Sequence, residues 1–343
     1  MRILLACCLL LLSACSREPL YQSQSYVFGT LVDISIYGED ENRARGLSDH
    51  ILQDFQRLHG KLHAWQAGSE LSRLNQAFAA GQTPVSIDAE LATILRDATA
   101  WSLKSEGLFN PAIGQLIQQW GFQRDEFTPV AIDDAAIRRL VAAKPKMTDI
   151  VIHDQQVFST NPAVKLDLGG YAKGYALDRA ASYLRAQGVQ HALVNIGGNI
   201  IALGQHGEHA WKVGIQHPRQ PGPIATLELE DGWAIGTSGD YQRYFEQDGK
   251  RYCHLIDPGT GYPVDRTQSV TVLIPPAPDS GVISDVASKP IFLATAEQRV
   301  AQAKHMHIEH VLLIDAHGKI FASHSMAKKL RWVDQHVDWQ ALF

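Results

Sequence analysis

Four glycine-rich turns carry the side chains in this 343-residue sequence that could take part in chemistry. The first, residues 165–174 (KLDLGGYAKG), places two glycines between an apolar strand and an amphipathic helix. Backbone N–H groups at the start of such a helix form a natural phosphate site, to which Lys173 would add positive charge. The spacing fits neither the P-loop nor the G-x-G-x-x-G motif. Phosphate binding and simple packing of a helix on a sheet are both compatible with this turn.

The other three turns also combine glycine with polar side chains. Residues 195–199 (NIGGN) follow an apolar strand, and residues 236–244 (GTSGDYQRY) bring together hydroxyls, a carboxylate and a guanidinium. Residues 254–264 (HLIDPGTGYPV) place His254 three positions before Asp257. Taken singly, each could be an ordinary turn. Together they indicate a large ligand with phosphate groups that is held partly by the backbone.

Apolar periodicity predicts the elements that must position these turns. Helical spacing is expected over residues 42–63, 69–78, 88–104, 111–120, 133–143 and 171–187, and in a pair of helices near 283–305. Strands are expected at residues 26–37, 150–153, 156–159, 191–196, 211–216, 224–229 and 269–274. Helices come first and strands later, which predicts a single α+β unit with a mixed or antiparallel sheet.

The N-terminus predicts export. A short positive start and an apolar run over residues 3–12 lead to Cys15, which fits a signal peptide over residues 1–14. The sequence LSAC, which ends at Cys15, resembles the bacterial lipobox, so we expect Cys15 to be lipidated and residues 15–25 to be a polar tether. An ordinary secretory signal is the alternative. We therefore expect a periplasmic, lipid-anchored protein, and Ser16 slightly favours the outer membrane.

Charge and cysteine content exclude several classes of protein. The formal net charge is −5, and no basic stretch is long enough to bind nucleic acid. Cys253 is the only cysteine beyond residue 15, which rules out a fold built on disulfides. Neighbouring residues of a strand point to opposite sides, so we do not expect the Cys253 thiol to act as a nucleophile beside His254.

Six motifs occur in order along the chain, at residues 28–30 (FGT), 69–75 (SELSRLN), 167–174 (DLGGYAKG), 195–198 (NIGG), 237–241 (TSGDY) and 254–263 (HLIDPGTGYP). Their order is similar to that in the ApbE family, whose members are FAD:protein FMN transferases and often periplasmic lipoproteins. The sequence resembles this family from about residue 25 to residue 325. The resemblance implies an α+β fold of the T-fold-like ApbE type, with a flavin transferase domain over residues 26–343.

The resemblance also implies a reaction. FAD is split at its pyrophosphate with the help of Mg²⁺, FMN is joined through a phosphoester to a Thr or Ser of a target flavoprotein, and AMP is released. The implied acceptor is a subunit of a membrane redox complex of the Rnf, sodium-pumping quinone reductase or nitrous-oxide-reduction type. Pyrophosphate chemistry depends on charge neutralisation and in-line positioning, and Mg²⁺ prefers oxygen ligands.

Individual residues acquire expected roles from the same resemblance. Contacts with FAD are expected from Phe28, Trp65, Leu108, Phe109, Asn110, Asp167, Lys173, His254 and Leu255. Ligands for Mg²⁺ are expected from the carbonyl of Gly170, the carboxylate of Asp285 and the hydroxyl of Ser288. His254 is expected to orient or deprotonate the incoming hydroxyl, which makes His254 and Asp285 the expected catalytic residues.

Lys289 departs from the family pattern, which commonly has Thr four residues after the metal-binding Asp. Four residues along a helix is the same face, so the ammonium of Lys289 would lie beside Asp285. Ser288 could supply a neighbouring hydroxyl, or Lys289 could pair with Asp285 and take over the role of the cation. The second outcome implies an alternative function, a periplasmic FAD-binding lipoprotein or FAD pyrophosphatase without acceptor transfer.

Overall fold

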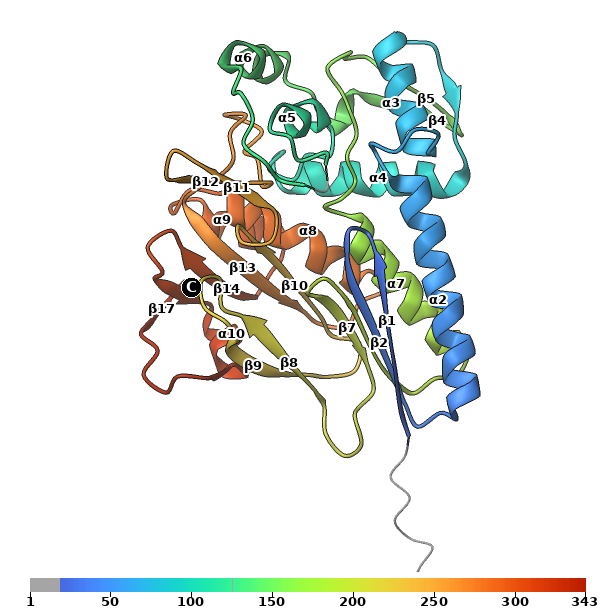
Figure 1. Cartoon of the computed structure of the whole chain (residues 1–343), viewed down its shortest axis with the longest axis vertical. Helices are drawn as coiled ribbons and strands as arrows, with labels where there is room; N and C mark the ends of the chain where they lie inside the picture. The colour runs from blue at the N-terminus through green and yellow to red at the C-terminus, as the bar shows by residue number, and fades with distance from the viewer. Residues whose placement is uncertain (1–18, 125) are drawn as a thin grey trace, which may run out of the picture.

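A nine-stranded sheet forms the centre of the computed structural model, which describes residues 19–124 and 126–343 (Figure 1). Its strand order is β1-β2-β6-β7-β10-β13-β14-β15-β17, and neighbouring strands are antiparallel except for β15 and β17. The strands are β1 Leu20–Val27, β2 Thr30–Tyr37, β6 His191–Ile196, β7 Asn199–Leu203, β10 Ala234–Gly239, β13 Thr267–Ile274, β14 His310–Asp315, β15 Ile320–Ala322 and β17 Trp339–Ala341. The predicted α+β class with a mixed, mostly antiparallel sheet is confirmed.

Smaller sheets lie beside the large one, with strand orders β11-β12, β16-β9-β8 and β3-β5-β4. Their strands are β3 Val85–Ser86, β4 Ile150–His153, β5 Gln156–Ser159, β8 Trp211–Gln216, β9 Pro223–Leu229, β11 Tyr244–Gln247, β12 Lys250–Cys253 and β16 Arg331–Trp332. The ranges of β4, β5, β6 and β8 agree with those expected from the sequence.

Most helices begin close to the positions expected from the sequence. They are α2 Glu41–Leu62, α3 Glu70–Ala80, α4 Ala89–Lys104, α5 Gly114–Gln119, α6 Asp134–Ala143, α7 Ala172–Ala186, α8 Ser280–Leu293, α9 Arg299–His305 and α10 His324–Lys329, with a 3₁₀ turn, η1, at Met147–Asp149. Side-chain oxygens of Asp40, Ser69, Asp88 and Asp133 accept N–H groups of a first helical turn, which is what an N-cap residue does.

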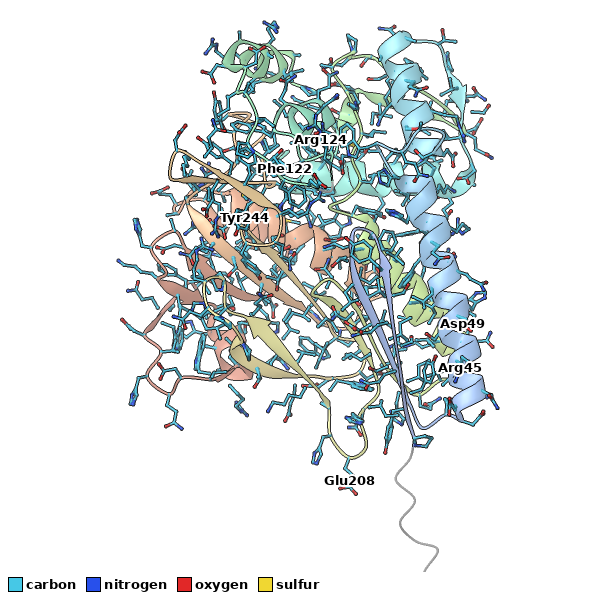
Figure 2. All side chains as sticks on the ribbon, in the orientation of Figure 1. Arg45, Asp49, Phe122, Arg124, Glu208 and Tyr244 are labelled. Atoms are coloured by element: carbon cyan, nitrogen blue, oxygen red, sulfur yellow. The ribbon has the colours of Figure 1, made fainter. Side chains whose placement is uncertain are left out.

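Helices and a small sheet cover opposite faces of the large sheet. Helices α2, α7 and α8 pack on one face, where they bury side chains such as Ile34 and Val272. Strands β8 and β9 pack on the other face, where Trp211 and Leu227 meet Leu273. Because side chains alternate along a strand and both faces are covered, β13 is buried along its whole length. On the outer side of α2, Arg45 and Asp49 point to solvent (Figure 2).

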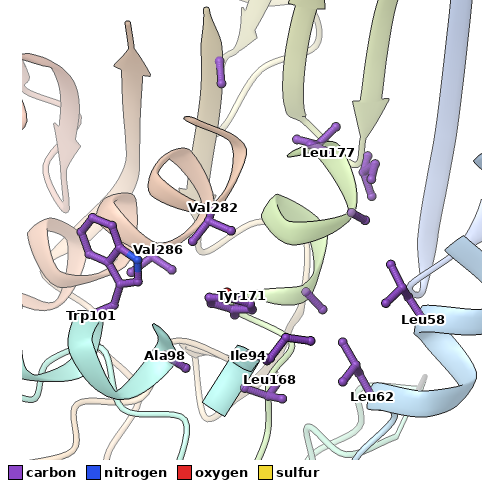
Figure 3. Close-up of a cluster of buried hydrophobic side chains, with 14 of the residues drawn as sticks. Leu58, Leu62, Ile94, Ala98, Trp101, Leu168, Tyr171, Leu177, Val282 and Val286 are labelled. Carbon is purple, nitrogen blue, oxygen red and sulfur yellow. The ribbon is translucent and has the colours of Figure 1, made fainter. Parts of the chain in front are cut away.

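Helix α4 fixes the position at which α7 and α8 meet. Trp101 and Ala98 of α4 lie beside Val286 of α8 and Tyr171 at the start of α7 (Figure 3). The hydroxyl of Tyr171 donates a hydrogen bond to Asp97 Oδ2 at 2.6 Å. The start of α7 is therefore held by both apolar packing and a partly buried hydrogen bond.

Three sequence predictions need correction. The strand expected over residues 26–37 is a hairpin, in which β1 pairs with β2 from Leu20↔Tyr37 to Val27↔Thr30. Residues 20–25, expected to belong to the polar tether, are therefore part of β1; this edge strand tolerates polar residues because its side chains are alternately exposed. The helix expected over residues 111–120 begins only at Gly114, because residues 111–113 pair instead with the segment at 165–167.

The expected signal peptide, residues 1–14, and the expected lipidation site, Cys15, lie outside the described residues. Within residues 19–124 and 126–343, no helix is both long and apolar enough to cross a membrane.

Candidate functional site

A cleft of about 640 Å³ opens at one end of the large sheet, beneath the part of the chain formed by α3 to α6. Three of the four glycine-rich turns line this cleft, at residues 167–173, 237–243 and 254–256. The fourth, Asn195–Asn199, instead connects β6 to β7. It supports the wall of the cleft indirectly, because Gly197 packs against Thr30, which lines it.

All residues expected to contact FAD line the cleft, and so does Gly170. They are Phe28, Trp65, Leu108, Phe109, Asn110, Asp167, Lys173, His254 and Leu255. Asp285 and Ser288 do not line it: both side chains are 1% exposed and lie on α8 behind the wall. The structure thus brings the sequence-predicted residues together in two layers, one facing the cleft and one behind it.

Phe28 is held at the edge of the cleft by a strained turn. Phe28 and Gly29 connect β1 to β2, with φ angles of 57° and 69°. Positive φ at both central residues is typical of a type I′ hairpin turn, but a bulky residue is rare in that conformation. The Phe28 ring packs against Phe55 and His59, with centroid distances of 5.9 and 5.6 Å. Strain of this kind at a cleft indicates a functional requirement for the ring.

Trp65 and Asp167 form a polar and aromatic wall. Trp65 Nε1 donates to Asp167 Oδ2 at 2.9 Å, and the N–H of Gly169 donates to Asp167 Oδ1 at 2.8 Å. The ammonium of Lys165 lies over the Trp65 ring at 4.4 Å from its centroid. The indole is thus fixed in position, with its ring available to stack on a planar ligand.

Asn110 shapes the cleft through its own loop. Its Nδ2 donates to the carbonyl of Pro145 at 2.9 Å, and its Oδ1 accepts the N–H of Ala112 at 3.1 Å. Both ends of the amide are therefore engaged with backbone. The amide of Asn110 therefore holds the loop that lines the cleft, and the expected contact with a ligand would be made from this fixed position.

His254 has the geometry of a neutral base. Its Nδ1 lies 3.2 Å from the carbonyl oxygen of Arg243, which can only accept, so Nδ1 carries the proton and Nε2 the lone pair. Burial lowers the pKa of His254 well below its ordinary value, and the positive charges of Arg243, Lys173 and Lys289 add to this effect. At neutral pH the imidazole is therefore uncharged and able to take up a proton.

Cys253 does not contribute to the chemistry of the cleft. Its side chain is 1% exposed and is not among the cleft-lining side chains, and its Sγ lies 3.4 Å from the carbonyl oxygen of Val264 and 3.9 Å from that of Leu255. This placement agrees with the expectation that Cys253 and His254 point to opposite sides.

The N-terminal turns of α7 and α8 cap each other. Asp285 of α8 accepts the N–H of Gly174, in the first turn of α7, at 3.0 Å. Asp178 of α7 accepts the N–H groups of Gly281 and Val282, in the first turn of α8, at 2.7 and 2.8 Å. The helices approach closely because glycine stands at both contacts; a Cβ on Gly174 would lie 2.4 Å from the carbonyl oxygen of Gly281.

Lys289 occupies the space between two of the expected metal ligands. Its Nζ lies 2.7 Å from Asp285 Oδ1 and 2.5 Å from the Asp285 carbonyl oxygen. Its aliphatic stem crosses Gly170, where an added Cβ would lie 2.7 Å from Lys289 Cε. Burial raises the pKa of Asp285, but the ammonium groups of Lys289 and Lys173 outweigh burial, so this pKa lies below its ordinary value.

These residues do not fit a magnesium site. One oxygen of the Asp285 carboxylate is bound to Lys289 and the other to the N–H of Gly174. Ser288 Oγ is engaged as well, with Ser238 Oγ at 2.8 Å and the Asp285 carbonyl at 3.2 Å. In the part of the chain that the structure describes, no cluster of three or more His, Cys, Asp or Glu residues could hold a metal ion. The ligand set expected from Gly170, Asp285 and Ser288 is replaced here by an ion pair.

Sequence reasoning missed several side chains that line the cleft. His59 and His63 lie on the last turns of α2 and at its C-cap, with ring centroids 5.0 Å apart, and both face the cleft. Their i, i+4 spacing was a usable signal, because such residues share one helix face. Phe122, labelled in Figure 2 above the β11–β12 hairpin, stacks on Phe245 and gave no such signal.

Sequence comparison places these features in a family. The chain matches the sequence profile of the ApbE family over residues 28–312. It is 41% identical to the FAD:protein FMN transferase of Rhodobacter capsulatus over 90% of this chain and 58% of that protein, so it spans little more than half of that relative's length. The FAD:protein FMN transferase of Treponema pallidum (strain Nichols) is 30% identical, over 93% of this chain and 91% of that protein.

Solved structures agree in fold over almost the whole chain. The ApbE protein of Thermotoga maritima superposes with a TM-score of 0.83 and 28% identity, covering 91% of this chain and 100% of that one. The flavin transferase ApbE of Vibrio cholerae superposes with a TM-score of 0.77 and 27% identity, covering 91% and 99%. With its matching sequence profile and its fold, this chain belongs to the ApbE family.

Proposed function

We propose that this protein transfers FMN from FAD to a Thr or Ser hydroxyl of a target flavoprotein. The observation that carries the proposal is the neutral imidazole of His254 in a cleft that also presents the cations Lys173, Lys289 and Arg243. A base beside several cations suits phosphoryl transfer, in which the phosphates need charge neutralisation and the nucleophile needs to lose a proton. Relatives named FAD:protein FMN transferase support the choice of FAD as substrate.

The proposed step has a defined balance of bonds. The acceptor hydroxyl oxygen forms a bond to the phosphorus on the FMN side of the pyrophosphate. The bond from that phosphorus to the bridging oxygen breaks, and AMP leaves with the bridging oxygen and the electron pair. The hydroxyl proton passes to Nε2 of His254. We assign the aromatic side chains Phe28, Trp65 and Phe109 to the planar rings of FAD, because flat rings stack favourably on aromatic walls.

Magnesium dependence, which the family resemblance implied, is not part of this proposal. The carboxylate and hydroxyl expected as ligands are both engaged within the protein. Binding and orientation of the pyrophosphate are therefore assigned to the cationic side chains of the cleft.

The cellular setting is a further part of the proposal. The LSAC sequence ending at Cys15 supports lipidation after removal of residues 1–14, and with it a periplasmic, membrane-anchored protein. Such an anchor suits an acceptor subunit of a membrane redox complex of the Rnf, sodium-pumping quinone reductase or nitrous-oxide-reduction type. Expression of a Cys15→Ser variant tests the anchor: the protein should move from the membrane to the soluble periplasmic fraction, and unchanged fractionation would contradict lipidation.

Incubation with FAD and a candidate acceptor subunit tests the transfer itself. We expect a flavin-fluorescent acceptor band that survives denaturing electrophoresis, together with release of one AMP for each flavin attached. His254→Gln should abolish this band while FAD binding persists, and His63→Gln, a neighbouring cleft histidine, provides the matched control. Tight FAD binding without a covalent band for any of the three acceptor types would refute the transferase assignment.

The ion pair between Lys289 and Asp285 favours a second candidate function, that of an FAD-binding lipoprotein or FAD pyrophosphatase. The same assay separates them. A pyrophosphatase releases free FMN and AMP without an acceptor, whereas a carrier releases neither.

A further inference from the structure

Lys289 is built into the wall between the cleft and the buried carboxylate of Asp285. Its side chain is 17% exposed and lines the cleft, whereas Asp285 is 1% exposed. An ammonium has three N–H donors, of which two point to the carbonyl and the carboxylate of Asp285. One donor is therefore left for a ligand in the cleft.

The absence of a side chain at Gly170 leaves room for the side chain of Lys289. Among the glycines of the described chain, Gly170 is the one at which an added Cβ would meet the stem of Lys289, at 2.7 Å from Cε and 3.1 Å from Cδ. The φ of Gly170 is not in the left-handed region, so its backbone does not itself require glycine. The space that Gly170 leaves is the space through which Lys289 passes.

Helix capping does not account for Lys289. Asp178 accepts two N–H groups at the start of α8, as Asp285 accepts one at the start of α7, and the ion pairs of the described residues give Asp178 no lysine or arginine. A capping aspartate in this helix pair therefore needs no cation as its partner. The cation beside Asp285 serves something other than the cap.

We propose that the ammonium of Lys289 stands where a divalent cation would bind and supplies its charge to the pyrophosphate of FAD, so that flavin transfer by this protein needs no metal ion. This inference rests on the proposed function for the identity of the substrate. Lys289 and Lys173 line the cleft, whereas Asp285 lies behind its wall, so the phosphates would face the two lysine side chains and not the carboxylate. As the bond to the bridging oxygen breaks, negative charge builds up on the departing AMP, and a cation held in place stabilises it without reorganisation.

Metal binding gives a readout that does not depend on turnover. Mn²⁺ added to the full-length, FAD-saturated protein is followed by electron paramagnetic resonance. We expect the wild-type protein to leave Mn²⁺ free in solution, whereas Lys289→Thr, which removes the ammonium and adds a small oxygen ligand beside Asp285, should bind it. Lys289→Met, which removes the charge without adding a ligand, is the matched control and should bind less Mn²⁺ than Lys289→Thr. Stoichiometric Mn²⁺ binding by the wild-type protein at the cleft would overturn the proposal even if the variants failed to fold.

The affinity for FAD reports on the direct contact. Loss of a hydrogen bond to a charged group should weaken FAD binding to Lys289→Met about tenfold or more, measured by quenching of flavin fluorescence in excess EDTA. Lys165→Met removes an ammonium that lies over the Trp65 ring but is not among the cleft-lining residues, and it should change the affinity less. Equal affinity of wild type and Lys289→Met would contradict the proposed contact.

Turnover then separates this inference from the proposed function. Wild-type protein should attach flavin to its acceptor at the same rate in excess EDTA as in excess Mg²⁺, whereas Lys289→Thr should require the metal. Transfer by the wild-type protein that occurs with Mg²⁺ and stops with EDTA would overturn the inference and leave the proposed function intact. Absence of transfer under both conditions, with FAD bound, would instead refute the proposed function.

Discussion

Helices α7 and α8 present the same local arrangement twice, and the two copies differ in charge. Gly174 and Asp178 of α7 have the same spacing as Gly281 and Asp285 of α8, and each glycine N–H is bound by the aspartate of the other helix. Burial raises the pKa of Asp178 to about 7, against the stabilising effect of its two backbone hydrogen bonds. The pKa of Asp285 lies below its ordinary value because Lys289 and Lys173 outweigh burial.

The two copies share the residues required for packing the helices and differ in the residues near the cleft. Close packing of two helix starts requires glycine and a carboxylate on each side, and both copies provide them. Positive charge is added only to the copy that lies behind the cleft. Lys289 can therefore be assigned to ligand chemistry and not to the assembly of the helix pair.

The largest difference between the two copies should be in protein stability, when Asp285 and Asp178 are each replaced by Ala. Asp285→Ala leaves the ammonium of Lys289 without its partner and should destabilise the protein by about 3–5 kcal/mol. Asp178→Ala removes only backbone contacts and should lower stability by about 1–2 kcal/mol. Urea denaturation followed by tryptophan fluorescence measures both. Equal losses would mean that the ammonium of Lys289 tolerates the loss of its carboxylate partner.

Replacing Gly174 and Gly170 by Ala should have different effects, because Gly174 lies against backbone and Gly170 against a flexible side chain. Gly174→Ala would press a methyl group against the carbonyl of Gly281, 2.4 Å away, and overpacking of this kind costs about 1–3 kcal/mol. Gly170→Ala would clash with the movable stem of Lys289 and make only an ordinary contact with Phe109, so it should lower FAD affinity with little change in stability. Thermal unfolding and FAD titration of the two variants provide the test; a larger stability loss for Gly170→Ala would contradict the assignment.

The raised pKa of Asp178, the aspartate without a lysine partner, should appear in the pH dependence of stability. The folded protein keeps Asp178 protonated up to a pKa of about 7, against 3.8 for the ordinary carboxyl. The stability from this group is thus complete below pH 3.8 and falls as the pH rises to about 7. Asp285, with a lowered pKa, has the opposite sign and loses its contribution only in acid. Denaturation of Asp178→Asn should show a flatter dependence between these pH values, and an unchanged slope would argue against a raised pKa.

The smallest predicted effect is that of the Lys289 charge on the pKa of His254. Lys289 helps to lower the pKa of His254, so wild-type turnover should fall only well below pH 6.5. In Lys289→Met one of these repulsive charges is gone, and the acidic limb of the pH–rate profile should move upward. Steady-state rates measured with saturating FAD would show this shift; a limb that stays in place would indicate that Lys289 is too well screened to influence His254.

Much of the local structure could be predicted from the sequence because its causes are local. The caps Asp40 and Ser69, and the contact of Lys289 with Asp285 one helical turn away, follow from helix geometry alone. The polar residues of β1 resemble a tether because an edge strand need not be apolar. The two-residue turn at Phe28 and Gly29 was not recognised because the first position of such a turn is usually Asn or Gly and not Phe.

The remainder depends on contacts between segments far apart in the chain. The capping of Gly174 by Asp285 joins residues 111 positions apart, so neither helix reveals it alone. The repeated Gly-x-x-x-Asp pattern was visible in the sequence, but its meaning appears only when the two helices cross. In the same way, no local signal indicated that Lys289 passes over Gly170.

Burial of Cys253 has a consequence for the redox behaviour of the protein. Burial raises the pKa of its thiol to about 12, so almost no thiolate forms at neutral pH. The thiolate is the nucleophile that reacts with oxidants and attacks disulfides, and a buried thiol is also out of their reach. The described part of this protein therefore needs no reductant to protect its cysteine, and its activity should survive an oxidising compartment unchanged.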